Sequence, residues 1–367
     1  MKFLLKNLST NDVYSLTRSS RLDSIFALPH FVDLELRDYE KTCFYVEIND
    51  VETGLGTVTP VVISKLQMGL KIAFCPSPPQ IIHGFNKINK RWRAILNTLI
   101  QHIKQNHNCM AISMNQRPHD YQFVRSNTDG CKLSHYHDII IDLSRELRAI
   151  YYGMDKRHRY TLRKASGCSD DELLSSNWLR KTGFMIRQGV GQESLHEFRL
   201  LWIETLKRMY ESFNPLRKLL YRDPLTLKSL IAVFNQLYPH GLVKLFTIYD
   251  NDGQPRVSAI FYTSNNFTKI PMAYWSAGAS SQKGRRKGLP LLLQWHIIQR
   301  FKEHGYQRYY MGGYDVKNPN RGPSLFKRGF GGQIVSGLTI TWRVQPLRTM
   351  YNLISHIARL TSAFRRV

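Results

Sequence analysis

Acidic residues are scarce in this chain of 367 residues. Asp and Glu together number 27 against 52 Lys and Arg, which gives a formal net charge of +25. An excess of this size favours polyanionic partners, such as nucleic acid, a phosphorylated substrate or an anionic membrane surface. The alternative is positive charge spread over a solvated surface, so only clusters of basic residues point to a particular partner.

Cysteine is also rare and unpaired. The five cysteines are odd in number, and none belongs to a C-x-x-C pair. This pattern argues against a disulfide framework and predicts a reduced, cytoplasmic protein. His135 and His137 alternate onto one face of a predicted strand, but no Cys or further His has the spacing of a zinc site. We therefore expect neither a metal nor a resident cofactor.

Long apolar runs and hydrolase motifs are missing as well. No run approaches the roughly 20 apolar residues that a membrane span needs. The first residues, "MKFLLKNLSTNDVY", contain only a short apolar stretch, so we expect no signal peptide there. No G-x-S-x-G or Ser-His-Asp arrangement is visible. These absences argue against an integral membrane protein and against a serine hydrolase.

One order of predicted elements occurs twice. In the second half, the strands "LVKLFTIYD", "VSAIFYTS" and "TKIPMAYWSAG" precede a helix in "LPLLLQWHIIQRFKEHG" and a strand in "YQRYYMGG". The first half repeats this order with "CFYVEIND", "GTVTPVVIS", "LKIAFCPS", a helix in "KINKRWRAILNTLIQHIKQ" and the strand "CMAISMN". Leu291, Trp295, Ile298 and Phe301 show the helical period. The repetition predicts a duplicated fold.

The order of elements is that of the GNAT acyltransferase fold. We predict an α/β (α+β) protein with two tandem GNAT-like domains, each a mixed central sheet flanked by helices. The expected boundaries are residues 1–147 and 148–345. The last residues, 346–367, predict an amphipathic basic helix that packs back on the body.

Four motifs resemble those of the FemABX-type peptidyltransferases. "IIIDLSRELRAIYYGMDKRHRYTLRKA" looks like the junction between the two domains of that family, and "WIETLKR" is similar to its helix with T-x-x-R. "LPLLLQWHIIQRFKEHGYQRYYMGGYD" resembles its L-L-x-W helix and glycine-pair strand, and "LFKRGFGGQIV" its F-K-x-x-F-G signature. The motifs occur in the family's order, and "PSPPQIIHG" resembles its Pro-rich, Gly-ended loop.

The resemblance implies transfer of an aminoacyl or acyl group onto an amine. In the best-known branch, the donor is aminoacyl-tRNA and the acceptor is a cell-wall precursor that carries a nucleotide or lipid diphosphate. The chain departs from the family at Asn115 and Gln116, where relatives often have a carboxylate. We expect a cytoplasmic aminoacyltransferase of cell-envelope biosynthesis, with peripheral contact to an anionic membrane as a further option.

The stretch "LFKRGFGG" is the candidate catalytic segment. The resemblance makes Lys327 the residue that stabilises an oxyanion, while Phe326 supplies an apolar wall. Gly331 belongs to the glycines that allow a close backbone approach. The alternative is a structural turn whose phenylalanines fill the core and whose lysine lies in water. Asp315, which follows Gly312 and Gly313 at a strand end, is the candidate acid–base partner or else a turn-forming aspartate.

Two basic clusters and one helical arginine are candidate phosphate ligands. Arg208 has the planar guanidinium that suits phosphate, although an exposed arginine or an ion pair with Glu204 fits equally well. The first cluster contains the phosphate-binding candidates Arg159, Arg163 and Lys164, and the second contains the donor-binding candidates Arg285, Arg286, Lys287 and Gly288.

The second cluster also resembles the R-x-x-G-x-G/A loop that binds the pyrophosphate of coenzyme A. Pro290 replaces its last small residue and has no N–H to donate. Three hypotheses therefore stand: an aminoacyl-tRNA-dependent transferase, an acyl-coenzyme A-dependent N-acyltransferase, and a non-catalytic tandem module that binds a polyanion.

Overall fold

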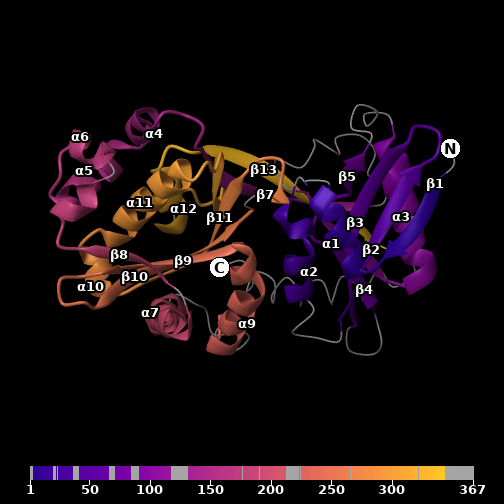
Figure 1. The fold of residues 1–367 in the computed structure, drawn as a ribbon, viewed down its shortest axis with the longest axis horizontal. Coiled ribbons are helices and arrows are strands. Elements are labelled where there is room, and N and C mark those ends of the chain that lie inside the picture. The colour runs from indigo at the N-terminus through magenta and orange to yellow at the C-terminus, as the bar shows by residue number, and fades with distance from the viewer. Residues whose placement is uncertain are drawn as a thin grey trace. The chain divides into compact units, whose positions relative to one another are not determined.

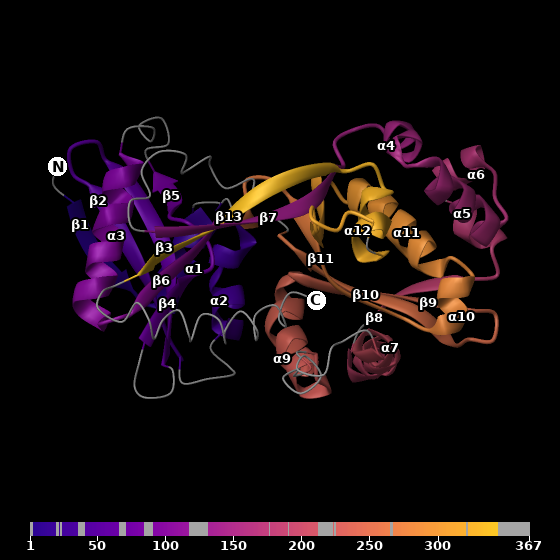
Figure 2. The ribbon, with the colours of Figure 1, turned by 180° about the vertical axis from the view of Figure 1, so that it is seen from behind.

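The computed structural model describes residues 3–19, 22, 24–35, 41–65, 71–83, 91–116, 131–175, 177–189, 191–211, 223, 225–264, 267–320 and 322–343. The predicted helix over 346–367 and the segment "HDYQFVRSNTDG" at 119–130 lie outside these residues. Contacts divide the chain into two units (Figures 1 and 2). The first contains Met1–Tyr136, Asn266–Lys269 and Ser336–Ile357, and the second His137–Asn265, Ile270–Val335 and Ala358–Val367.

The first unit has a mixed sheet in the order β1-β2-β3-β4-β6-β13, with β5 paired to β3. Its pairings are antiparallel except for β4 with β6. The helix α3 buries Ile95, Leu99 and Ile103 on one face, as its 3.6-residue period predicts. The elements are β1 (Phe3–Leu8), α1 (Thr10–Ser19), η1 (Ile25–Ala27), α2 (Pro29–Glu35), β2 (Lys41–Asp50), β3 (Leu55–Lys65), β4 (Lys71–Cys75), β5 (Gln80–His83), α3 (Trp92–His107), β6 (Ala111–Gln116) and β13 (Gln333–Arg343).

The second unit repeats this plan with the strand order β7-β12-β11-β10-β9-β8. Its pairings are antiparallel except for β11 with β12, which occupy the place of β4 and β6. The elements are β7 (Cys131–Asp142), α4 (Leu147–Gly153), α5 (Lys156–Ser166), α6 (Asp170–Leu174), η4 (Trp178–Lys181), β8 (Met185–Gly189), α7 (Gly191–Glu211), α9 (Leu227–Leu237), η5 (Tyr238–His240), β9 (Val243–Tyr249), β10 (Pro255–Thr263), β11 (Met272–Ser280), α10 (Gln282–Arg286), α11 (Leu289–Glu303), β12 (Arg308–Gly313) and α12 (Gly322–Arg328).

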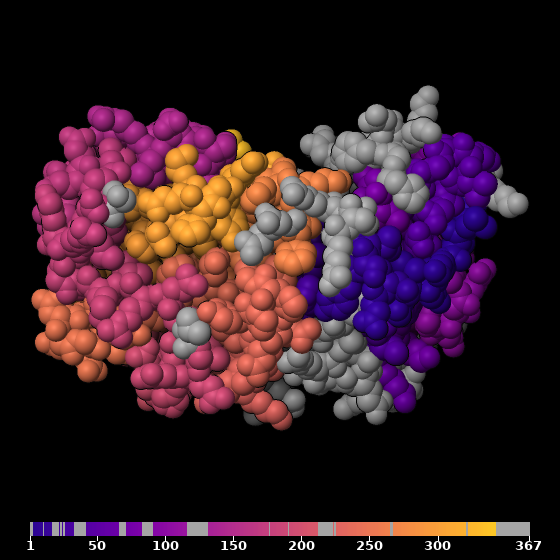
Figure 3. All heavy atoms as spheres, in the orientation of Figure 1, coloured from indigo at the N-terminus to yellow at the C-terminus, as the bar shows by residue number. Residues whose placement is uncertain are grey.

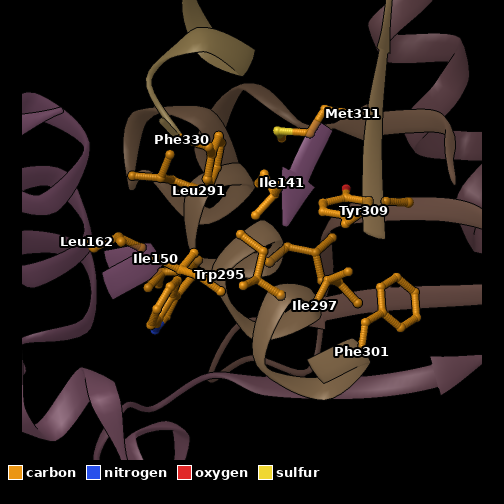
Figure 4. Close-up of a cluster of buried hydrophobic side chains, with 14 of the residues drawn as sticks. Ile141, Ile150, Leu162, Leu291, Trp295, Ile297, Phe301, Tyr309, Met311 and Phe330 are labelled. Carbon is orange, nitrogen blue, oxygen red and sulfur yellow. The ribbon is translucent and has the colours of Figure 1, made fainter. Parts of the chain in front are cut away.

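Helices cover both faces of the second sheet. On one face lies α11, whose N-cap Gly288 has a φ of 72° and whose apolar residues are buried almost all round. Figure 4 shows Trp295 and Ile297 of this helix among Ile141, Tyr309 and Phe330. On the other face, α7 packs against β10 and β11 and buries its apolar stripe. Each buried large side chain contributes about 1.5–3 kcal/mol, so this two-sided core is what holds the strand ends in place.

Two strands pair within a different unit from the one that chain order predicts for them. The strand β13 follows the second repeat but pairs with β6, from Leu338 opposite Gln116 to Arg343 opposite Ala111. The carboxyl half of β7 pairs with β12, where Asp142 lies opposite Arg308. The predicted boundaries at 147 and 345 follow chain order, whereas the pairing exchanges one strand in each direction. Strand periodicity predicts that a segment is extended, but it does not name the neighbour of that segment.

Candidate active site

The strands β11 and β12 are paired only at their amino ends. Parallel pairing runs from Met272 opposite Arg308 to Tyr274 opposite Tyr310 and then stops, although both strands continue. The register of β12 against β7 shifts between Tyr310 and Gly312, and Gly312 has a φ of 79°. Such a bulge with a left-handed glycine re-aims the backbone at the end of a strand. The two strands therefore separate beyond Tyr274 of β11 and Tyr310 of β12.

Lys327 occupies this point of separation. Its Nζ donates to the Gly313 carbonyl oxygen at 2.9 Å and lies 5.6 Å from the centroid of the Trp275 ring. A Cβ at Gly312 would lie 3.6 Å from the same ammonium. Burial of the ammonium lowers the pKa of Lys327 to about 8, while the negative charge of Asp138 acts in the opposite direction. No ion pair to Lys327 occurs among the residues that the structure describes.

The segment around Lys327 is a short helix, whereas the sequence predicted a turn. Residues 322–328 form α12, and Lys327 lies in its last turn. Phe326 packs against the core of the second unit and contacts Trp275 and Phe330, with ring centroids 6.0 and 5.3 Å apart. Phe330 itself is fully buried. The phenylalanines therefore anchor the helix, and the Lys327 ammonium lies at the strand ends.

The glycines after Lys327 are required by close contacts. Gly331 has a φ of 72°, and a Cβ there would overlap the carbonyl group of Gly153. A Cβ at Gly332 would lie 2.8 Å from the Ile140 carbonyl oxygen. Gly313, in contrast, has open space around it, so its contribution is the carbonyl group that faces Lys327. A Cβ at Gly332 would also lie 2.7 Å from the Ile139 Cγ2, but movement of that side chain would not remove the backbone overlap at either glycine.

The structure uses Asp315 to build a turn. Its carboxylate accepts hydrogen bonds from the backbone N–H of Lys317 at 3.0 Å and from Asn318, through both backbone and side chain. The carboxylate that acts on the charge of Lys327 is Asp138, a buried residue of β7 that lies opposite Gly313 in the sheet register. Sequence reasoning missed Asp138, although it stands next to His137 in the segment "SHYHD".

Arg208 and Arg285, predicted for two different ligands, lie close together. Thr205 of α7 is fixed to the end of β11, since its hydroxyl accepts from the backbone N–H of Ser280 at 3.0 Å. Arg285 donates to the Ser280 carbonyl oxygen at 2.7 Å. Partial burial and the positive charge of Arg285 lower the pKa of Arg208. Two guanidinium groups held near each other form a favourable place for an anion.

The basic residues of α5 have different environments. Arg163 donates to Asp170 at 2.7 Å, and Tyr151 donates to the same carboxylate at 2.5 Å, so Arg163 is part of a structural network. Arg159 lies over the Tyr152 ring, 5.3 Å from its centroid. Lys164 is exposed. Only Arg159 and Lys164 of this predicted cluster are therefore available to a ligand without breaking an ion pair that the structure describes.

The helix α5 also lies against the beginning of α11. A Cβ at Gly288 would lie 3.0 Å from Thr161 Cγ2 and 3.2 Å from the Ala165 Cβ, so the glycine allows the two helices to approach. In Figure 3, the magenta atoms of α4 to α6 lie beside the golden atoms of α11 on one face of the second unit. The two basic segments that the sequence singled out thus border one surface.

The segment that the sequence marks as the candidate donor-binding site is a helix where the sequence predicted a loop. Residues 282–286 form α10, which is capped by Ser281 and held by Lys283, whose Nζ lies 3.4 Å from a carboxylate oxygen of Asp250. Arg286 and Lys287 are exposed, and Lys287 Nζ lies 5.9 Å from the centroid of the Phe184 ring. Pro290 stands in the first turn of α11, so this helix offers one N–H fewer to a pyrophosphate.

Within the described ranges, no group of three or more His, Cys, Asp and Glu side chains is arranged to hold a metal ion. His135 is exposed and His137 is half-buried. Over the same ranges, no helix is both long and apolar enough to cross a membrane.

No family model matches the sequence, and no curated protein does. Solved structures share the fold. FemX matches with a TM-score of 0.68 and 13% identity over 96% of this chain and 100% of that chain. L-PGS from Bacillus licheniformis matches with a TM-score of 0.57 and 14% identity over 98% and 97% of the two chains. A tandem GNAT protein from the clavulanic acid biosynthesis pathway matches with a TM-score of 0.51 and 11% identity over 94% and 99%. The predicted FemABX-like tandem GNAT fold is therefore confirmed.

Proposed function

We propose that the protein is an acyltransferase that moves an aminoacyl group from aminoacyl-tRNA onto an amine of a phosphate-bearing precursor of the cell envelope, in the cytoplasm. The amine nitrogen attacks the ester carbonyl carbon, and the carbonyl electron pair moves onto oxygen. When the intermediate collapses, the ester C–O bond breaks. The leaving hydroxyl takes the proton that the amine loses, so the products are an amide and a free hydroxyl.

The environment of Lys327 is the observation that carries this proposal. An ammonium has three N–H donors, and one of them is used by Gly313. No second hydrogen-bond partner of Nζ occurs within the described part of the chain, so two donors remain for an oxyanion. Partial burial strengthens such an interaction because water competes less for the charge. The ammonium stays largely protonated at neutral pH, since the pKa of Lys327 is about 8.

Arg208 and Arg285 support the phosphate-bearing partner. Burial and the positive charge of Arg285 lower the pKa of Arg208, and a phosphate between the two guanidinium groups would offset this repulsion. The exposed cations of α5, α10 and the start of α11 would add a diffuse attraction for a polyanion such as tRNA. The likeness of the fold to FemX is consistent with this assignment at the level of architecture.

The first experiment identifies the donor. Purified protein is exposed to mixed pools of aminoacyl-tRNA and acyl-coenzyme A, and mass spectrometry shows which donor is retained or consumed.

The second experiment compares Lys327→Met with Arg328→Met, since Arg328 is the exposed neighbour on the same helix. Loss of the oxyanion donor should lower kcat about 10²–10³-fold with little change in the acceptor KM.

The control variant Arg328→Met should keep wild-type kcat. Equal losses of turnover and acceptor binding in Lys327→Met would contradict the role of Lys327 in the transition state. An absence of turnover with every donor tested, together with steeply salt-dependent binding of RNA or anionic vesicles that survives Lys327→Met, would support a non-catalytic polyanion-binding module.

A second candidate is an acyl-coenzyme A-dependent N-acyltransferase. The specific observation in its favour is β11, whose backbone beyond Tyr274 has no partner on the β12 side among the described strands, so it can bind an extended ligand by hydrogen bonds. Pro290 weighs against it. Acetyl-coenzyme A that raises the melting temperature, with tRNA having no effect, would select this candidate.

A further inference from the structure

The carboxyl end of α12 contains one carbonyl group that its own helix does not satisfy. The last carbonyl groups of a helix lack intrahelical donors. In α12, Leu325 receives the N–H of Gly329, Lys327 receives that of Phe330, and Arg328 receives that of Gly331. Because Phe330 bonds to Lys327 in a tighter turn, the carbonyl group of Phe326 is left over.

His158 of α5 supplies the missing donor. Its Nε2 lies 2.9 Å from the Phe326 carbonyl oxygen, and this oxygen can only accept, so Nε2 carries the proton. The imidazole is buried and contacts the rings of Phe326 and Phe330, with centroids 5.8 and 5.1 Å apart. The carbonyl it binds belongs to the residue directly before Lys327.

Asp155 holds His158 from the other side. Its carboxylate lies 3.1 Å from Nδ1 and also accepts the backbone N–H of His158 at 2.8 Å, as the N-cap of α5. The backbone N–H of Asp155 donates to the Gly329 carbonyl oxygen at 3.0 Å. A Cβ at Gly329 would overlap the imidazole ring, so this glycine provides the space for His158. The start of α5 and the end of α12 are thus joined on both sides of the ring.

We propose that His158, oriented by Asp155, is a positioning residue that fixes the carboxyl end of α12 and thereby holds the Lys327 ammonium against the Gly313 carbonyl and the Trp275 ring. The effect of His158 on catalysis rests on the proposed role of Lys327. Its effect on the position of the ammonium does not, because that position can be measured without turnover. His158 binds the backbone of Phe326 and makes no contact with the reacting groups, so it acts through Lys327.

The same arrangement gives α5 a way to act on Lys327. The helix α5 contains Arg159 and Lys164, which are open to a phosphate. The same helix contains His158, which bonds to the Phe326 carbonyl oxygen of α12. A ligand on α5 that shifted the first turn of this helix would move the imidazole and, through Phe326, the ammonium.

The experiment uses the full chain and three variants. His158→Gln retains a donor at the position of Nε2, His158→Leu removes it, and Gly329→Ala leaves the histidine in place but fills its space. Reductive ¹³C-methylation of lysines, with Lys327→Met to assign the signal, gives the pKa of Lys327 by NMR titration. Circular dichroism and melting temperature report whether each variant is folded.

The wild type and His158→Gln should show a Lys327 pKa near 8, well below that of exposed lysines. In His158→Leu and Gly329→Ala, the ammonium should become more hydrated and its pKa should rise by one unit or more toward 10.5. In assays, these two variants should lose kcat at least tenfold, with the acceptor KM unchanged, and His158→Gln should restore most of it.

An unchanged Lys327 titration in folded His158→Leu and Gly329→Ala would overturn the inference. If His158→Leu does not fold, Gly329→Ala and His158→Gln decide by the same titration. If the Lys327 titration shifts in these variants but the wild type turns over no donor, the positioning role stands and the proposed function is wrong. The two failures are therefore distinguishable.

Discussion

A lysine whose pKa is about 8 titrates within the range in which an acyltransferase is assayed. Only the protonated form of Lys327 can stabilise an oxyanion, so kcat/KM should fall about tenfold per pH unit above pH 8. The acceptor amine must also be neutral, so this fall is read from the ratio of the wild-type rate to the Lys327→Arg rate, in which the rising limb of the amine cancels. Lys327→Arg should move the falling limb above pH 10, because a guanidinium does not lose its proton there.

A pH–rate profile from pH 5.5 to 10 checks this prediction. A rate that still rises above pH 9 in the wild type would show that Lys327 does not act as a cation.

The pH dependence of folding stability is a separate prediction from the same pKa. Because the pKa of Lys327 is lower in the folded protein, the unfolded chain keeps the proton between about pH 8 and 10.5, and the folding free energy becomes more favourable as pH rises through this window. Lys327→Met should lack this rise.

At the residue scale, sequence reasoning singled out Lys327 as a candidate but did not find the residues around it. The F-K-x-x-F-G pattern singled out Lys327 and Phe326, since both stand in a short local motif. Asp138, His158 and Trp275 come from three distant segments and meet Lys327 or its helix only through the fold. The glycines gave the one local signal, because Gly329 and Gly331 in a helical end predict a close neighbour without naming it.

At the scale of single elements, α5 and α7 each present a basic residue with a different expected role. Arg163 is paired with Asp170, whereas Arg208 faces another guanidinium. Arg208→Met should raise the acceptor KM about tenfold or more, in line with the loss of one charge-assisted hydrogen bond, and should not lower the melting temperature. Arg163→Met should lower the melting temperature by a few degrees and leave the KM unchanged.

Steady-state kinetics and thermal unfolding of both variants test this contrast. The same outcome in both variants, either a KM effect or a stability effect alone, would contradict the separation. Sequence patterns located both helices because their apolar periods are strong. They did not distinguish the two arginines, since an ion pair depends on which helix lies opposite.

On the scale of the whole chain, the exchange of β7 and β13 ties the end of the sequence to the first unit. Ile340 of β13 is fully buried and lies opposite Met114 of β6. Ile340→Ala should destabilise the first unit by about 2–5 kcal/mol, as a buried large-to-small substitution does. Hydrogen exchange should therefore rise in β6 and α3, which are more than 200 positions earlier in the sequence.

The matched control is Ile334→Ala, an exposed residue at the other end of the same strand. It should leave hydrogen exchange in β6 and α3 unchanged. Increased exchange confined to β13 itself in Ile340→Ala would argue against the pairing. The order of strands within each repeat was predictable from periodicity and turns, but the partner of β13 was not, because an isolated strand pattern fits the edge of either sheet.

The pairing of β6 with β13 also has a consequence for synthesis on the ribosome. The sheet of the first unit lacks β13 until both repeats have been translated, although its other strands emerge early. During that interval, one side of β6 has no permanent partner, and open strand edges of this kind recruit chaperones or other nascent chains. A premature stop codon shortly before β13 should therefore impair the folding of both units and not of the second unit alone.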